Sequence, residues 1–101
     1  MQNIKVHQVG KILDASTSAE EQAAILAILD QNENVALDLS HCTYVSSAGL
    51  RVMLYSFKVA KSKKLVLYLV RVSDDVKDVM KMTGFDKFFT YFNTVDECLK
   101  S

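Results

Sequence analysis

Two short and almost wholly apolar runs, at residues 35–39 and 65–70, constrain the fold of this chain more than any other feature. Runs of this length without polar alternation are typical of strands buried on both faces. The stretch between them has the spacing of a helix, from about residue 47 to residue 62. Buried strands joined by a helix predict a parallel sheet covered by helices, which is an α/β fold. Asp38, the one charge in the first run, is expected to have a structural role at the strand end.

The rest of the chain continues this alternation of strands and helices. We expect an extended N-terminal segment over residues 4–13, helices over about 18–31 and 74–82, a strand over 88–92 and a short helix after Thr94. Ser73 and Gly84 suit the two ends of the third helix, because serine caps free N–H groups and glycine adopts the left-handed conformation. With 101 residues, the sequence predicts one domain with a mixed, mostly parallel sheet of about four strands and about four helices.

Two of the expected helix starts have the capping-box pattern, a hydroxyl residue followed three residues later by glutamate. The first helix offers Ser18 with Glu21, or the equivalent pair one residue earlier, and the last helix offers Thr94 with Glu97. In such a pair the hydroxyl accepts a free backbone N–H and the carboxylate reaches back to the cap residue. Both helices are therefore predicted to begin at these positions.

Charge and hydropathy exclude two classes of partner. Twelve basic and twelve acidic residues give a net charge of zero, whereas a nucleic-acid-binding domain usually has a basic excess. No stretch approaches the roughly 20 apolar residues of a membrane span, and no polybasic patch is present. The N-terminal MQNIKVHQVGK lacks the apolar run of a secretory signal. The sequence therefore predicts a cytoplasmic protein that binds neither nucleic acid nor a membrane.

The residues that catalysis or metal binding would need are scattered. Cys42 and Cys98 share no motif, and we expect two buried core thiols in a reducing compartment. The two histidines, His7 and His41, belong to no recognisable triad or metal motif. Gly49 stands alone, so no glycine-rich phosphate loop is present. The sequence predicts a protein without enzymatic activity, metal or cofactor.

The helix expected over residues 47–62 has two apolar stripes. Large apolar side chains at positions 50, 53, 54 and 57 have the spacing of one buried face. Ala48, Val52, Tyr55 and Val59 fall on the opposite side of the helix. One stripe must face the sheet, and we predict that the second is exposed and binds a partner, with Tyr55 as an anchor. Helix packing that buries both stripes is the alternative.

Ser46 and Ser47 stand at the start of the same helix. Unpaired N–H groups and the positive end of the helix dipole converge there, so a phosphate on either hydroxyl would be stabilised locally. The alternative is that each serine is present only as a helix cap. Their spacing from the helix start does not distinguish these two roles.

The order and spacing of four motifs resemble the STAS domain family, the fold of bacterial anti-sigma factor antagonists. The motifs are LDAST at 13–17 after Gly10, NVALDLS at 34–40, YVSSAGL at 44–50, and MTGF at 82–85 followed by two phenylalanines at 88–89. The third motif resembles the phosphoacceptor loop and helix start of the family, and the resemblance covers nearly the whole chain. It implies a four-helix α/β domain that works by switched binding.

The resemblance also implies a cycle of binding and modification. In the family, an unmodified antagonist docks on an anti-sigma factor that is also a serine kinase, and docking frees the sigma factor. The kinase then phosphorylates the antagonist with ATP and Mg²⁺, which ends the complex, and a phosphatase resets it. The matching acceptor is Ser47, with Ser46 as the second choice, and Asp14 occupies the acidic position of the family. An Asp14 that only forms a turn is the alternative.

The chain departs from the family pattern at three places. Many phosphorylated members have an acidic residue where this chain has Ser46, and often a second serine where it has Ala48. The N-terminal segment has room for one strand where the family usually has a hairpin. An exposed sheet edge favours pairing with another chain, so the oligomeric state, a dimer included, stays open. The alternative function is an unphosphorylated STAS accessory or scaffold subunit of a transporter or signalling assembly.

Overall fold

In the computed structural model, which describes residues 3–101, four strands form one sheet in the order β1-β3-β5-β6. They are β1 (Ile4–Gln8), β3 (Asn34–Asp38), β5 (Leu67–Val70) and β6 (Tyr91–Phe92). A second sheet of two strands pairs β2 (Ile12–Leu13) with β4 (Tyr44–Val45). Every strand pair in the described residues is parallel, which confirms the predicted α/β fold with a mostly parallel sheet of four strands.

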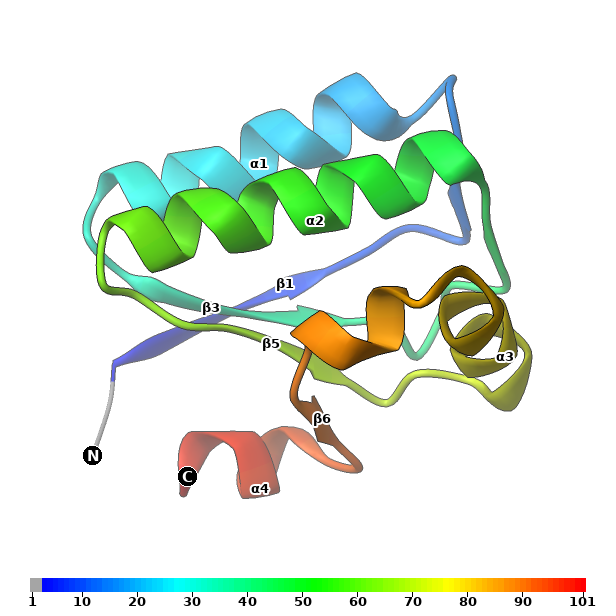
Figure 1. Cartoon of the computed structure of the whole chain (residues 1–101). Helices are drawn as coiled ribbons and strands as arrows, with labels where there is room; N and C mark the ends of the chain where they lie inside the picture. The colour runs from blue at the N-terminus through cyan, green and yellow to red at the C-terminus, as the bar shows by residue number, and fades with distance from the viewer. Residues whose placement is uncertain (1–2) are drawn as a thin grey trace.

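Helices cover both faces of the four-stranded sheet to different extents. Two long helices, α1 (Ser18–Asp30) and α2 (Ser47–Ser62), lie side by side over one face (Figure 1). The short helix α4 (Val95–Leu99) lies on the other face, against β3, β5 and β6. The helix α3 (Asp74–Thr83) and the 3₁₀ turn η1 (Phe85–Phe88) lie near the end of the sheet where α2 begins (Figure 1). Strand β1 is left at an edge of the sheet, as expected from a single N-terminal strand.

The two apolar runs form the centre of the core. Leu37 and Leu69 are fully buried on the side of the sheet covered by α1 and α2. Ala36 and Val70 face the opposite side, where they form a smaller cluster with Cys98 of α4. Because both faces of β3 and β5 are covered, these strands need no polar alternation, and the sequence pattern is explained.

Several helix boundaries follow the sequence prediction. The helix α2 spans Ser47–Ser62, as predicted. The Ser73 hydroxyl accepts a backbone hydrogen bond at the start of α3, and Gly84 ends that helix in the left-handed conformation with a φ of 79°. Thr94 and Glu97 form the predicted capping box of α4. Local hydrogen-bonding rules are sufficient at these three positions because the partners lie within one turn.

The predicted capping box of the first helix is wrong. Thr17 is the N-cap of α1, but its side chain makes no capping bond and its hydroxyl donates instead to the carbonyl of Ile12 at 2.9 Å. The Glu21 carboxylate accepts from the N–H of Gly10 at 2.7 Å and pairs with Nε2 of His7 at 2.7 Å. Glu21 therefore ties α1 to strand β1 and the loop after it, and a tertiary contact has replaced the local one.

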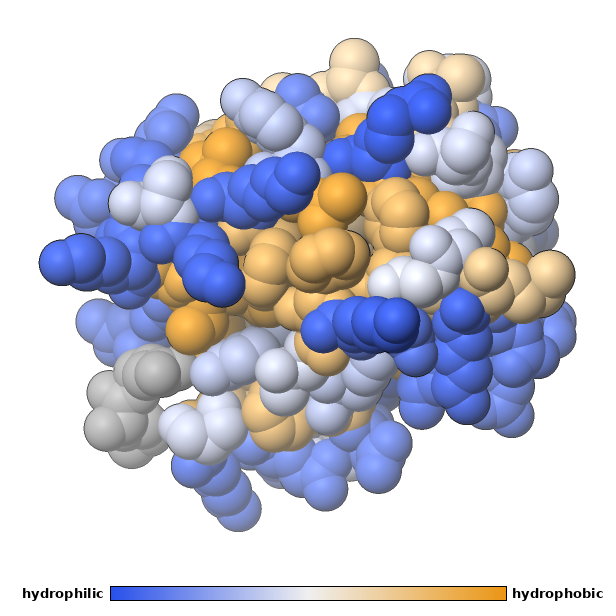
Figure 2. Space-filling view, viewed as in Figure 1, coloured by the Kyte–Doolittle hydropathy of each residue, from blue (hydrophilic) through white to orange (hydrophobic). Residues whose placement is uncertain are grey.

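The predicted strand over residues 88–92 is wrong for most of its length. Phe85–Phe88 form the turn η1, and only Tyr91–Phe92 pair with β5. The rings of Phe88 and Phe89 pack on Phe57 of α2, with centroid distances of 6.3 and 5.3 Å. Packing of aromatic rings against α2 has overridden the strand preference of this stretch. Figure 2 shows the apolar surface over the region between α2 and η1, surrounded by hydrophilic side chains.

Both cysteines are free thiols in the core, as predicted. Cys42 and Cys98 have relative exposures of 1% and 0%. Burial raises the pKa of both thiols, so neither forms a thiolate readily at neutral pH. Their role in this domain is to fill core space.

The described part of the chain has neither a membrane-spanning helix nor a metal-binding cluster. Within residues 3–101, no helix combines the length and the apolar character that crossing a bilayer requires. Over the same residues, no three histidine, cysteine, aspartate or glutamate side chains are placed together so that they could hold a metal ion.

Candidate functional site

The two serines at the start of α2 have different environments. Ser46 is the N-cap: its hydroxyl accepts the N–H of Gly49 at 3.3 Å and its carbonyl accepts the N–H of Leu50 at 2.9 Å. The N–H of Ser46 donates to the carbonyl of Leu13 at 3.0 Å. Ser47 is the first residue of the helix and is exposed. The Ser46 hydroxyl thus already has a structural role, whereas the Ser47 side chain is accessible.

Gly49 allows the start of α2 to approach strand β2 closely. A Cβ atom at Gly49 would lie 2.4 Å from the carbonyl oxygen of Leu13 and 2.8 Å from its Cγ atom. No L side chain fits at such distances, so glycine is required by the close approach of two backbone segments. Strand β2 pairs with β4, which leads directly into Ser46. The helix start and these two strands therefore hold Ser47 in one position.

Asp14 lies in the loop that follows β2, next to the residue that binds Ser46. Its carboxylate accepts hydrogen bonds from the N–H and the hydroxyl of Ser16, at 2.8 and 2.7 Å. These bonds lower the pKa of Asp14 and keep it ionised. The structure places this loop beside the start of α2, and it also gives Asp14 the turn role that was the alternative. A contact of Asp14 with a partner stays a prediction.

A groove between α1 and α2, which we call the α1–α2 groove, lies beside this helix start. It is lined by Ser18 and Gln22 of α1 and by Ala48, Arg51, Val52, Leu54, Tyr55 and Lys58 of α2, and its volume is about 490 Å³. Tyr55 is 52% exposed, so its ring is available for contact. Apolar side chains and two cations form the groove, and no carboxylate is among its described lining residues. Such a surface suits a partner with both apolar and acidic groups.

The exposed apolar stripe predicted on α2 is only partly correct. Tyr55 is exposed, as predicted, and Ala48 is partly exposed. Val52 is buried, with 5% exposure, and Val59 is partly buried and packs against the main core. For Val52 and Val59 the alternative, burial by helix packing, is therefore correct, because both side chains pack within the domain. Val59 is also absent from the groove lining, and it no longer belongs to the candidate partner surface.

The exposed face of α2 could not be predicted from the spacing of its apolar residues. Ser47, Arg51, Leu54, Tyr55 and Lys58 follow one another along one side of the helix at helical spacing. Small residues at positions 49, 56 and 60 are buried and mark the opposite side. Small side chains let a helix pack closely on its neighbours. The positions of the small residues in the sequence could therefore have identified the buried face of α2.

Leu54 provides a test of this assignment, because its predicted burial is wrong. Leu54 is partly exposed in the α1–α2 groove, whereas its neighbour Met53 is fully buried. We expect Leu54→Ala to cost less than about 2 kcal/mol of unfolding free energy, below the range for a fully buried leucine, because no closed cavity forms. Met53→Ala, the matched control, should cost clearly more. Urea denaturation of both variants measures the difference, and equal losses would show that the two faces are misassigned.

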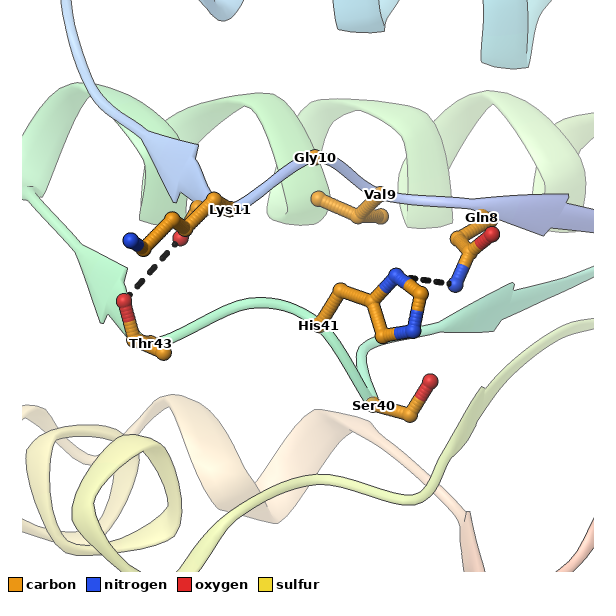
Figure 3. A pocket seen from close by; sticks show the side chains of 7 residues that line it. All are labelled: Gln8, Val9, Gly10, Lys11, Ser40, His41 and Thr43. Carbon is orange, nitrogen blue, oxygen red and sulfur yellow. Dashed lines mark hydrogen bonds between the residues drawn. The ribbon is translucent and has the colours of Figure 1, made fainter.

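A second depression lies at the carboxyl ends of β1 and β3 (Figure 3). Its lining residues are Gln8, Val9, Gly10, Lys11, Ser40, His41 and Thr43, and its volume is about 560 Å³. Nε2 of Gln8 donates to Nδ1 of His41 at 2.8 Å, and the Thr43 hydroxyl donates to the carbonyl of Lys11 at 3.3 Å. Among these lining residues, no hydrogen bond joins the Ser40 hydroxyl to His41, as the serine–histidine pair of an activated nucleophile would require. None of the sequence-predicted site residues lies here.

Asp38 has the structural role that the sequence predicts. It is 5% exposed at the end of β3, and it accepts hydrogen bonds from Nη2 of Arg71 at 2.6 Å and from the N–H of Ser40 at 2.9 Å. Burial alone would raise the pKa of this carboxyl, but the bonds from Arg71 and Ser40 outweigh burial and hold the pKa below its usual value. Arg71, directly after β5, has a φ of 56°, a left-handed conformation that is uncommon for a residue other than glycine.

Acidification is expected to destabilise the domain through Asp38. Because its pKa is lower in the folded than in the unfolded chain, Asp38 stabilises the fold above about pH 4, and this contribution is lost as the pH falls through the folded pKa. Asp38→Asn should lower stability at pH 7, because Arg71 loses its partner. The unfolding free energy of this variant should also fall less steeply as the pH is lowered. Urea denaturation between pH 7 and pH 3 measures both slopes. Parallel slopes for the two proteins would exclude a contribution from Asp38.

Comparisons with known proteins identify a matching family and a curated relative. The STAS domain family matches residues 2–98. BtrV of Bordetella bronchiseptica, which is assigned as an anti-sigma factor antagonist, is 31% identical over 84 residues, or 82% of this chain and 72% of BtrV. This match and the four sequence motifs agree on the same family.

Solved structures share the fold, and two examples differ in their described roles. The phosphorylated form of SpoIIAA, a Bacillus cell fate determinant, has a TM-score of 0.74 at 15% identity, over 99% of this chain and 91% of SpoIIAA. A sulfate transporter family protein of Wolinella succinogenes has a TM-score of 0.83 at 13% identity, over 96% of this chain and 82% of that protein. At these identities the likeness concerns the fold alone. The family match over nearly the whole chain, together with the identity to BtrV, shows that this chain belongs to the STAS domain family.

Proposed function

We propose that this chain is an anti-sigma factor antagonist, which binds an anti-sigma factor with serine kinase activity and is released when Ser47 is phosphorylated. The observation that carries the proposal is the exposed Ser47 at the start of α2, beside the α1–α2 groove. The assignment of BtrV as an antagonist supports the same role. Ser46 is the second choice as acceptor, since its hydroxyl caps the helix.

In the proposed reaction, the Ser47 hydroxyl oxygen attacks the γ-phosphorus of ATP that the kinase holds with Mg²⁺. A bond forms between this oxygen and phosphorus, and the bond from phosphorus to the β,γ-bridging oxygen breaks, so that ADP leaves with the electron pair. The hydroxyl proton passes to a base of the kinase. A phosphatase returns the serine by hydrolysis. This chain contributes only the accessible acceptor and its fixed position.

The phosphate is expected to favour the free chain over the complex. It adds nearly two negative charges to a surface that a docked partner would shield from water. Removing this charge from water costs more than several good contacts provide. In the free chain the phosphate stays hydrated, and the unpaired N–H groups of the first turn of α2 stabilise it. We assign Asp14, Ser46, Ala48 and Tyr55 to the surface that the partner covers, and the mostly buried Val52 contributes only to the lining of the groove.

Tyr55 is the expected anchor of this surface. Tyr55→Ala should weaken binding of the kinase by about 1–3 kcal/mol, because an aromatic ring in a groove loses most of its contact area, and should leave folding intact. Tyr44→Ala is the matched control, since Tyr44 is 55% exposed but does not line the groove. Isothermal titration calorimetry measures both affinities. A similar affinity for the parent chain and Tyr55→Ala would count against the groove as the docking site.

The accessory-subunit function is the second candidate, since the fold of this chain also occurs in a sulfate transporter family protein of Wolinella. Affinity purification of the tagged chain from its native cells, followed by mass spectrometry, distinguishes the two. A serine kinase of the anti-sigma factor class among the bound proteins is the expected result. A transporter ATPase in its place would overturn the proposal and favour the accessory subunit.

A further inference from the structure

The two cations of the α1–α2 groove are without ion-pair partners in the described structure. Arg51 and Lys58 are exposed, and within residues 3–101 neither has a carboxylate within 4.0 Å of its charged group. Glu21 of α1, which precedes the groove residue Gln22 in the sequence, is held by His7 and Gly10. The groove therefore has a local positive charge, although the charges of the whole chain sum to zero. Unpaired charge beside exposed apolar groups favours a ligand of complementary charge.

Arg51 stands one helical turn after Ser47 and two turns before Lys58. Side chains four residues apart are neighbours on a helix, and both Ser47 and Arg51 are exposed. A phosphate on Ser47 therefore lies within reach of the guanidinium, which binds phosphate through two parallel hydrogen bonds. From Arg51 to Lys58 the helix rises by about 10 Å. Leu54 and Tyr55 lie between the two cations along the groove.

We propose that the groove receives an acidic helical segment of the partner kinase, and that Arg51 is the cation for which this segment and a phosphate on Ser47 compete. The segment has carboxylates about 10 Å apart, opposite Arg51 and Lys58, with an apolar side chain between them against Leu54 and Tyr55. In the unmodified chain Arg51 pairs with the partner. After phosphorylation the phosphate on Ser47 forms the ion pair with Arg51 instead, and it repels the partner's carboxylate opposite Arg51. This inference rests on the proposed function and assigns the switch to a particular residue.

The pairing of Arg51 with the phosphate is tested on the chain alone. A chain made with phosphoserine at position 47 is titrated by ³¹P NMR, in the parent background, in Arg51→Gln and in Lys58→Gln. We expect the phosphate to titrate about 0.3 pH unit lower in the parent than in Arg51→Gln, because the guanidinium favours the dianion. Lys58→Gln, with its change three turns away, should titrate as the parent does. Equal midpoints for the parent and Arg51→Gln would overturn the competition.

The acidic occupant is tested with the kinase that copurifies with the parent chain. Calorimetry compares the parent, Arg51→Gln and Lys100→Gln, a charge-matched control whose change lies just after α4 on the other face of the sheet. Arg51→Gln should bind about tenfold more weakly and should lose part of the salt dependence of binding, while Lys100→Gln should match the parent. If Ser47→Asp weakens binding but Arg51→Gln does not, the proposed function stands and this inference falls.

Discussion

Replacing Gly49 with alanine is expected to lower the free energy of unfolding by about 3 kcal/mol or more, at the upper end of the usual cost of overpacking. The added Cβ atom would lie 2.4 Å from the carbonyl oxygen of Leu13. That oxygen already accepts the N–H of Ser46, so strand β2 and the helix start cannot separate without breaking this bond. Any relaxation that accommodates the methyl group would therefore also displace Ser47.

Urea denaturation of Gly49→Ala and of Gly10→Ala tests this expectation. A Cβ atom at Gly10 would meet its nearest neighbour, Oε2 of Glu21, at 3.5 Å, which is an ordinary contact. The substitution at Gly10 should therefore change stability little. Gly49 is helical and Gly10 is not, so helix propensity alone would favour the alanine at position 49, and a loss there reflects the lack of space. If Gly49→Ala were no less stable than Gly10→Ala, the close approach that positions Ser47 would be refuted.

The second large effect is expected at Ser47. Ser47→Ala should abolish phosphate incorporation and keep partner binding, since it removes only the acceptor oxygen. Its cost in stability should be small, because Ser46 and not Ser47 is the N-cap, in contrast to the cap loss that the sequence alone would predict for Ser47. Ser47→Asp should keep the fold, because a carboxylate is favourable in the first turn of a helix. It should weaken the complex about tenfold or more by burying an unpaired charge.

Ser46→Ala is the matched control for both Ser47 variants. It should lose about 0.5–2 kcal/mol of stability with the cap, and it should still take up phosphate. Incorporation of ³²P from labelled ATP and thermal melting measure the two properties. Phosphate uptake by Ser47→Ala, or unchanged affinity of Ser47→Asp, would mean that the switch does not operate through this hydroxyl.

The fold was predictable from the sequence where burial and local hydrogen bonds decide the structure. The apolar runs became β3 and β5 because both of their faces are covered. The starts of α2, α3 and α4 and the end of α3 followed from residues within one turn of each boundary. Prediction failed where a contact with a residue distant in the sequence replaced the expected local structure. Glu21 bound the loop after β1 instead of its own helix start, and Phe88 packed on α2 instead of continuing a strand.

The candidate site was predictable in position but only partly in composition. Motif spacing located Ser46, Ser47 and Asp14, and the structure brings their loops together through the backbone of Leu13. The partner stripe was misplaced because counting apolar residues cannot tell an exposed valine from a valine packed on a neighbouring helix. Arg51 and Lys58 were missed because a charged residue on a helix is usually only solvated, and an apolar pattern gives no sign of a role for it. Their meaning depends on the groove beside them, which exists only once α1 and α2 are packed together.

Phosphopeptide mapping of the chain, after incubation with its copurified kinase, ATP and Mg²⁺, tests the central claim most directly. We predict that the phosphate is found on Ser47 and not on Ser46, and that the complex dissociates as phosphate is incorporated. Ser47 is the accessible hydroxyl of the pair, whereas the Ser46 hydroxyl caps α2. Phosphate on Ser46 would move the acceptor by one residue. No phosphate on either serine, with an active kinase bound, would contradict the switch and favour an accessory subunit that is never modified.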